Sequence, residues 1–179
     1  MISEEWKQQA LDVEFHWVTE TGEPAQLSAG ATIKPTHSFA TCPPLDCAMM
    51  GAHDSNHVMS KTEIDFIRKT YDDCVAFFFI CGGFLAALKS GLLEGKTATA
   101  PRPMVPMLQN MSQEVNWVTK RWARDGKIWT SGALLNGTDM TRAFAEETWG
   151  GPGTFAEFNM RLGGYPNRDI DYADVPWDI

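Results

Sequence analysis

The sequence is poor in positive charge, and this shortage excludes several classes of partner. Lysine and arginine together number 15, against 23 aspartates and glutamates, so the formal net charge is −8. A chain with this balance offers no broad basic face, which argues against nucleic acid or an anionic membrane as a partner. The local basic group at Lys120, Arg121 and Arg124 is more typical of a solvated hairpin surface.

Metal-binding and membrane signatures are also lacking. The four cysteines form no CxxC pair and no zinc-type spacing with histidine, so we expect no metal ion and no cofactor. The longest apolar run, Val75–Leu88, is interrupted by two glycines and is too short to span a bilayer. No basic and then apolar run follows Met1, so no secretory signal is predicted. We therefore expect a cytoplasmic protein with reduced thiols.

The order of apolar patterns predicts an α/β fold. A length of 179 residues favours a single sizeable core. Strand-like runs alternate with helical patterns, which is typical of a mostly parallel sheet covered by helices. The expected strands are Leu11–Val18, Ala31–Lys34, Leu45–Met50 and Val75–Ile80, and the expected helices are Ile2–Ala10, Lys61–Tyr71, Gly82–Ser90, Met104–Met111, Thr138–Thr148 and Phe155–Leu162.

The second half of the chain adds a hairpin and a tail. Asp125-Gly126 separates the β-like runs Asn116–Arg124 and Lys127–Ser131, and this dipeptide favours a tight hairpin. The last residues are irregular and acidic, with Tyr172 and Trp177 as expected aromatic anchors. We expect residues 1–150 to form the domain and residues 151–179 to form an extension that packs on it.

The apolar run VAFFFI passes directly into Cys81, two glycines and a helical pattern. An elbow between a strand and a helix lifts a side chain out of the sheet, and a helix N-terminus favours the thiolate. The amide of Gly82, with one from Gly51 or Ala52, could stabilise an oxyanion. The pattern predicts a nucleophilic cysteine. The alternative is a small buried apolar residue, since Phe79 stands where a G-x-S-x-G motif would have glycine.

Three stretches then resemble one family. CGGFLAALKSGLLEGKTATA, RWARDGKIWTSGALLNGTDMTRAF and HSFATCPPLDCAMMGAH are similar to the elbow, the hairpin with its following helix, and the glycine-loop strand of the ThiJ/PfpI superfamily. This is the superfamily of the Parkinsonism-associated deglycase, and the resemblance is strongest to its isonitrile-hydratase-like branch. It runs from about Leu11 to about Trp149.

The resemblance implies a flavodoxin-like three-layer sandwich with an added β-hairpin, usually a homodimer that acts on a small-molecule substrate. It implies that Cys81 is the nucleophile. In the isonitrile-hydratase-like branch, a cysteine attacks the isocyanide carbon to give a thioimidate, and water then releases an N-formamide. Fold-level kinship alone does not select this chemistry.

The chain also departs from the family pattern. The family's first strand and its acidic loop are not visible, so the domain is expected to be N-terminally shortened. Ala100-Pro101-Arg102 stands where many members carry histidine. His53 is a candidate replacement base and Asp54 a candidate acid or orienting group. Arg102 is a candidate holder of an anionic substrate group. The alternatives are a surface-loop histidine, a turn former and a solvated arginine.

These departures leave two further functions open. The chain could be a catalytically reduced member that binds a ligand or a partner, or that senses oxidants through Cys81. It could also carry the glyoxalase-like or deglycase-like activity of sister branches. That activity usually relies on an acid, a cysteine and a histidine, of which only the cysteine is visible.

Overall fold

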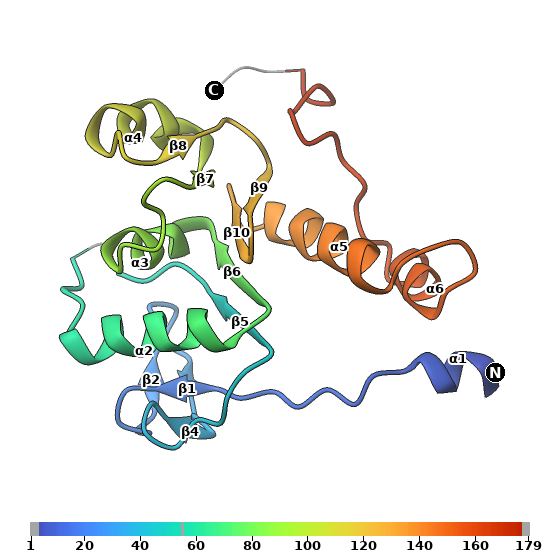
Figure 1. The fold of residues 1–179 in the computed structure, drawn as a ribbon, viewed down its shortest axis with the longest axis horizontal. Helices are drawn as coiled ribbons and strands as arrows, with labels where there is room; N and C mark the ends of the chain where they lie inside the picture. Colours follow the sequence, from blue (N-terminus) through green and yellow to red (C-terminus); the bar gives the residue numbers. More distant parts are fainter. Residues whose placement is uncertain (1–3, 55, 177–179) are drawn as a thin grey trace.

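A four-stranded sheet lies at the centre of the protein, whose computed structural model describes residues 4–54 and 56–176 (Figure 1). The strand order is β5-β6-β10-β9, with the first three strands parallel and β9 antiparallel to β10. The four strands are β5 (Cys47–Met50), β6 (Ala76–Ile80), β9 (Trp122–Asp125) and β10 (Ile128–Ser131).

Helices cover both faces of this sheet (Figure 1). The helices α2 (Lys61–Asp73) and α3 (Phe84–Lys89) lie on one face, and α5 (Asn136–Trp149) and α6 (Phe155–Leu162) lie on the other.

The strand β6 explains this layering, because successive side chains of a strand point to opposite faces. Phe77 and Phe79 join the core on the α2 and α3 side, whereas Phe78 packs with Trp129 and Met140 on the α5 side. The expected three-layer α/β sandwich with a mostly parallel sheet is confirmed.

The predicted hairpin forms, but its first strand is shorter than expected. Asp125 pairs with Ile128 across the Asp125-Gly126 turn, as that dipeptide predicts. The run Asn116–Arg124 forms two strands with a break between them instead of one strand. At the break, the amide of Arg121 donates to the carbonyl of Ile170, near the C-terminal end of the described chain, and not to a neighbouring strand. Beside the hairpin lie β7 (Thr97–Ala98), which pairs with β8 (Asn116–Trp117), the short turn η2 (Arg102–Met104) and α4 (Val105–Met111).

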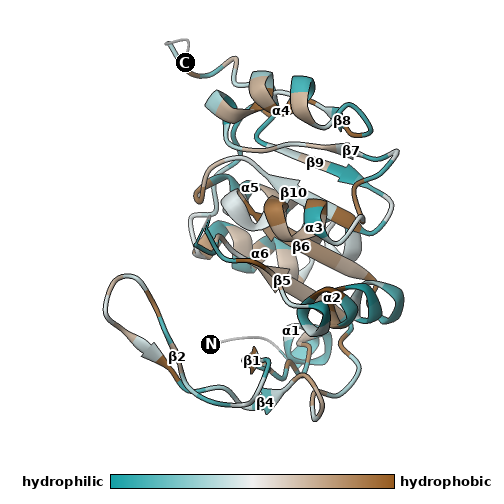
Figure 2. Cartoon of the chain, turned by 90° about the vertical axis from the view of Figure 1, so that its left-hand side faces the viewer, coloured by the Kyte–Doolittle hydropathy of each residue, from teal (hydrophilic) through white to brown (hydrophobic). Residues whose placement is uncertain are grey.

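The N-terminal region, defined as residues 4–46, contains one short helix and four two-residue strands. These are α1 (Glu4–Gln9), β1 (Val18–Thr19), β2 (Ala25–Gln26), β3 (Thr32–Ile33) and β4 (His37–Ser38). The pairs β1–β4 and β2–β3 form separate small sheets, and their ribbons stand apart from the main sheet (Figure 2).

Two strand predictions in the first fifty residues are wrong. The run Leu11–Val18 enters a strand only at Val18, because no described strand lies beside residues 11–17. Leu45–Met50 is not a buried strand. Within the described residues β5 pairs only with β6, so β5 is an edge strand, and the side chain of Met49 is 60% exposed.

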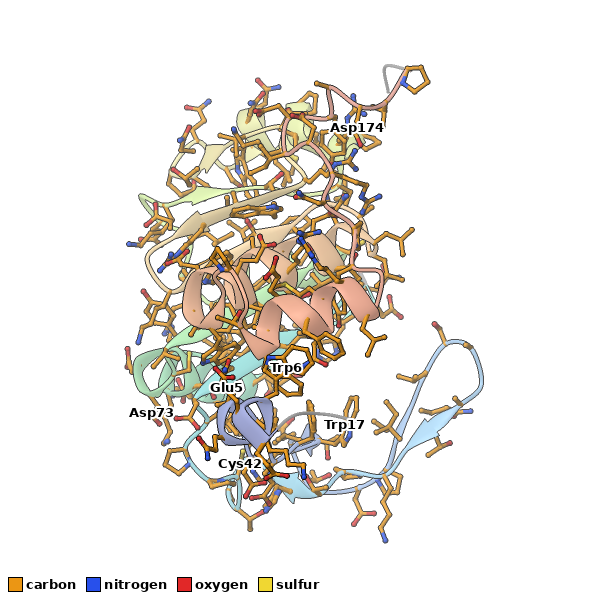
Figure 3. All side chains as sticks on the ribbon, turned by 90° about the vertical axis from the view of Figure 1, so that its right-hand side faces the viewer. Glu5, Trp6, Trp17, Cys42, Asp73 and Asp174 are labelled. Carbon is orange, nitrogen blue, oxygen red and sulfur yellow. The ribbon has the colours of Figure 1, made fainter. Side chains whose placement is uncertain are left out.

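Both ends of the described chain contact other elements. Near the N-terminal end, Trp6 of α1 contacts Phe158 of α6, with ring centroids 4.2 Å apart (Figure 3). Near the C-terminal end, the carbonyl of Ile170 accepts a hydrogen bond from the amide of Arg121. The expected anchor at Trp177 lies outside the described residues.

Among residues 4–54 and 56–176, no helix is both long enough and apolar enough to cross a bilayer.

Candidate active site around Cys81

Cys81 stands directly after β6 in an unusual backbone conformation. Its φ angle is 55°, in the left-handed region that residues other than glycine rarely adopt. Such strain persists only where the surroundings enforce it, and it is frequent at functional sites. The thiol is free and half-buried. The helix predicted over Gly82–Ser90 begins instead as a 3₁₀ turn, η1 (Cys81–Gly83), before α3 starts at Phe84.

Two glycines allow this elbow to press against the loop that follows β5. A Cβ atom at Gly83 would lie 2.3 Å from the carbonyl oxygen of Met50, which is closer than any side chain can approach. A Cβ atom at Gly82 would lie 2.9 Å from the Cβ atom of Ala52. The loop over residues 51–54 therefore lies against the elbow, as the shared carboxyl edge of parallel strands predicts.

His53 on this loop has an imidazole with no hydrogen-bonding partner among the described residues. Both ring nitrogens are buried and neither makes a hydrogen bond in the part of the chain that the structure describes. Burial lowers the pKa of His53, and the charge of nearby Lys89 lowers it further. The ring of His57 lies 6.0 Å away, between centroids, and that histidine contacts Glu63 at 2.8 Å. The lowered pKa favours the neutral form of the His53 imidazole.

Asp54 makes no hydrogen bond to this imidazole among the described residues. Its carboxylate accepts a hydrogen bond from the amide of Asn56 at 2.9 Å, so it shapes the turn of the loop. Within the described residues, the sulfur of Cys81 also makes no hydrogen bond to any side chain. The fold thus brings the two loops together without forming an acid–cysteine–base chain.

Arg102 lies in η2, which follows β7 of the two-stranded sheet β7-β8. Its guanidinium lies over the ring of Tyr172, 4.4 Å from the centroid, and its Nε atom is buried without a hydrogen bond. Tyr172 belongs to the C-terminal segment, defined here as residues 165–176. The hydroxyl of Tyr172 donates to the side chain of Asn136 at 3.1 Å.

Sequence reasoning missed two contributors to this region. The charge of Lys89, at the end of α3, lowers the pKa of His53. The side chain of Asn136, at the start of α5, accepts a hydrogen bond from the Tyr172 hydroxyl. Each comes from an element distant in sequence from its partner, so no local pattern could indicate it.

Two further observations concern where a ligand or a metal ion could bind. A hollow of about 370 Å³ lies between the start of α5 and the C-terminal segment and not at Cys81. Its lining includes Leu135, Thr138, Gly164 and Arg168. In residues 4–54 and 56–176, no group of three histidine, cysteine or carboxylate side chains gathers where it could hold a metal ion.

Comparison with known proteins identifies the family. The model of the DJ-1/PfpI family matches residues 5–147. The chain belongs to the DJ-1/PfpI family. The isonitrile hydratase of Pseudomonas putida is 33% identical over 144 residues, which are 78% of this chain and 61% of that protein. The chain therefore spans less than two thirds of that curated relative.

Solved structures of DJ-1/PfpI proteins share the fold at low sequence identity. A THiJ/PfpI family protein from Pseudomonas syringae superposes with a TM-score of 0.68 and 20% identity, covering 94% of this chain and 70% of that one. A DJ-1 superfamily protein from Salmonella typhimurium superposes with a TM-score of 0.70 and 14% identity, covering 89% of this chain and 86% of that one. At these identities, the likeness shows the fold alone.

Proposed function

We propose that the protein is a cysteine-dependent enzyme of the isonitrile-hydratase type, acting on an electrophilic carbon of a small metabolite. The observation that carries the proposal is the strained, half-buried Cys81 at the carboxyl end of β6. The 33% identity to an isonitrile hydratase supports the choice of chemistry. The homodimer that the resemblance implies and the cytoplasmic location that the lack of a secretory signal predicts stay predictions.

The proposed reaction adds water across an isocyanide. The thiolate of Cys81 attacks the terminal carbon, and protonation of that carbon gives a thioimidate on sulfur. Water then adds to the thioimidate carbon, and the carbon–sulfur bond breaks to restore the thiolate. The product is an N-formamide, so one isocyanide and one water are consumed for each product formed.

The loop opposite the elbow supplies the other proposed roles. Amides of Gly51, Ala52 and Gly82 would stabilise the charge that develops during attack. The neutral imidazole of His53 would take a proton from the attacking water. The carboxylate of Asp54 serves the loop turn, so its proposed part is to keep His53 in place.

The test is adduct formation and turnover with a small isocyanide. Wild-type protein should form the N-formamide, and mass spectrometry should find the transient adduct on the Cys81 peptide. Cys81→Ala should abolish both. The matched control is Cys42→Ala, because Cys42 is a second half-buried free thiol whose pKa is raised by burial. Undiminished turnover in Cys81→Ala would overturn the proposal.

A second function is favoured by one observation. Because no described side chain hydrogen-bonds the Cys81 sulfur, the protein could bind a ligand or sense oxidants without turnover. In that case isocyanides would give no product, while dilute peroxide would convert Cys81 to a sulfenic acid that dimedone traps. A Cys81 peptide that stays unmodified by peroxide would remove the sensor form of this alternative.

A further inference from the structure

Arg102 differs from every other arginine in having no acceptor for its N–H groups among the residues that the structure describes. The sequence holds seven arginines, all within the described residues. Six donate to a carboxylate, to a backbone carbonyl or to both; these are Arg68, Arg121, Arg124, Arg142, Arg161 and Arg168. Within residues 4–54 and 56–176, Arg102 has neither a hydrogen bond nor an ion pair, and its Nε atom is buried. A buried donor of this kind is costly unless a ligand satisfies it.

The C-terminal segment places the ring of Tyr172 against the Arg102 guanidinium. The ring of Tyr172 lies between two guanidinium groups, 4.4 Å from that of Arg102 and 4.5 Å from that of Arg121. Stacking of this type is attractive and orients a planar cation on the ring face. The φ angle of Tyr172 is 65°, so the segment accepts local strain at the residue that makes the stack.

Arg121 in turn fixes the tyrosine. It is buried, and it donates from Nε to the carbonyl of Asp169 at 2.7 Å and from its guanidinium to the carboxylate of Asp174 at 2.6 Å. Its backbone amide donates to the carbonyl of Ile170 at 2.8 Å. The guanidinium of Arg121 is therefore engaged in holding the segment, whereas that of Arg102 has no hydrogen-bond acceptor among the described residues.

The stack lies at the edge of the sheet where Cys81 stands. Gly132 directly follows β10, and the Tyr172 hydroxyl and the carbonyl of Ala100 lie 3.0 and 3.4 Å from the position that a Cβ atom at Gly132 would occupy. The last residue of β10, Ser131, is paired in register with Ile80, the residue before Cys81. Tyr172 and Ala100 therefore lie beside the residue that follows β10, and Cys81 follows the neighbouring strand, β6. Arg102 comes two residues after Ala100.

We propose that Arg102, positioned by Tyr172, binds the carboxylate of a small anionic substrate, so that the substrate class of this enzyme is carboxylate-bearing. A guanidinium presents paired N–H donors that match the two oxygens of a carboxylate. A single guanidinium carries one positive charge, which matches the single negative charge of a carboxylate. The substrate assignment rests on the proposed function, whereas the carboxylate site itself does not.

Binding without chemistry tests the site. In the Cys81→Ala variant, where no adduct can form, saturation-transfer NMR should detect benzoate but not benzamide, which has the same shape without the charge. Arg102→Met should weaken benzoate binding about tenfold or more, as expected for loss of a charge-assisted contact. Arg161→Met is the control, because Arg161 is an exposed partner of Glu157 on α6. No benzoate binding to the parent, or equal loss in both arginine variants, would overturn the site.

The role of Tyr172 is tested through two variants. Tyr172→Phe keeps the stacked ring and should bind benzoate within about twofold of the parent, whereas Tyr172→Ala should bind as weakly as Arg102→Met. Near-ultraviolet circular dichroism reports whether each variant keeps its packing. Unchanged benzoate binding in folded Tyr172→Ala would exclude a positioning role.

The substrate class is tested by a matched pair of isocyanides, isocyanoacetate and its methyl ester. Wild-type protein should form product from the acid with the higher kcat/KM, and Arg102→Met should remove that preference chiefly through KM. If neither isocyanide reacts while benzoate still binds through Arg102, the proposed function fails and the carboxylate site stands. An equal preference in wild type and Arg102→Met would overturn the substrate class.

Discussion

The N-terminal region and the sheet region, defined as residues 61–149, use similar apolar residues in opposite ways. Of the residues that form the N-terminal region, only Pro35 is buried. Alternate residues over 11–17 are large and apolar, yet their side chains are 55–76% exposed; they are Leu11, Val13, Phe15 and Trp17. In the sheet region, by contrast, Phe77, Phe78 and Phe79 are each at most 4% exposed.

The difference shows that a strand pattern needs a neighbouring strand. Alternation of apolar residues predicts one buried face, but burial requires a sheet partner that aligns the backbone. The run at β6 has partners on both sides, β5 and β10. The run over residues 11–17 has none among the described residues, and the outer edge of β5 is also unpaired there. Edges of this kind are prone to pair with another chain.

The largest expected effect is truncation inside the sheet region. Phe79 is fully buried and stacks on Phe77 with ring centroids 4.3 Å apart. Phe79→Ala should lower the free energy of unfolding by about 3–5 kcal/mol, because it removes apolar contacts and leaves a cavity. Urea unfolding followed by tryptophan fluorescence measures the change. A loss below about 1 kcal/mol would mean that the core relaxes around the gap.

A smaller effect is expected at the loop that joins the two regions. Burial lowers the pKa of His53, so the folded protein binds fewer protons than the unfolded chain near and below pH 6.5. Stability should therefore be full above about pH 6.5 and decrease as the pH falls through that value. His53→Gln should flatten this dependence in urea unfolding between about pH 5 and 8. An identical pH profile in the variant would mean that His53 is solvated in solution.

The smallest effect on stability is expected in the N-terminal region. There a phenylalanine-to-alanine substitution, which is strongly destabilising in β6, should change little. The side chain of Phe15 is 76% exposed, so Phe15→Ala should change the free energy of unfolding by no more than about 0.5 kcal/mol. Urea unfolding of Phe15→Ala and Phe79→Ala side by side makes the comparison direct. A loss at Phe15 as large as that at Phe79 would show that another segment or chain covers this face in solution.

Prediction from sequence worked best where one local signal was sufficient. The continuous apolar run of β6 and the Asp125-Gly126 turn were placed correctly. The helix predicted over Lys61–Tyr71 appears as α2, where Ser60 and Glu63 cap each other's backbone groups. The position of Cys81 at a strand-to-turn elbow also followed from its two glycines.

Prediction failed where a long-range partner decides the outcome. The exposure of β5 depends on whether a second strand lies beside it, and the sequence of β5 carries no sign of that. The run over residues 11–17 fails for the same reason, because no described strand lies beside it. In both cases a missing neighbour outweighed the local pattern.

The sequence by itself determined the layered α/β fold, the cysteine elbow and the family, because short-range patterns and a specific set of motifs carry these. Only the tertiary structure decided which side chains surround the site. It buries His53 and places it near the charge of Lys89, so the pKa of His53 is lowered. It also places Tyr172 between Arg102 and Arg121. These residues lie far apart in the chain, so their contacts exist only after the sheet has aligned the elements that bear them.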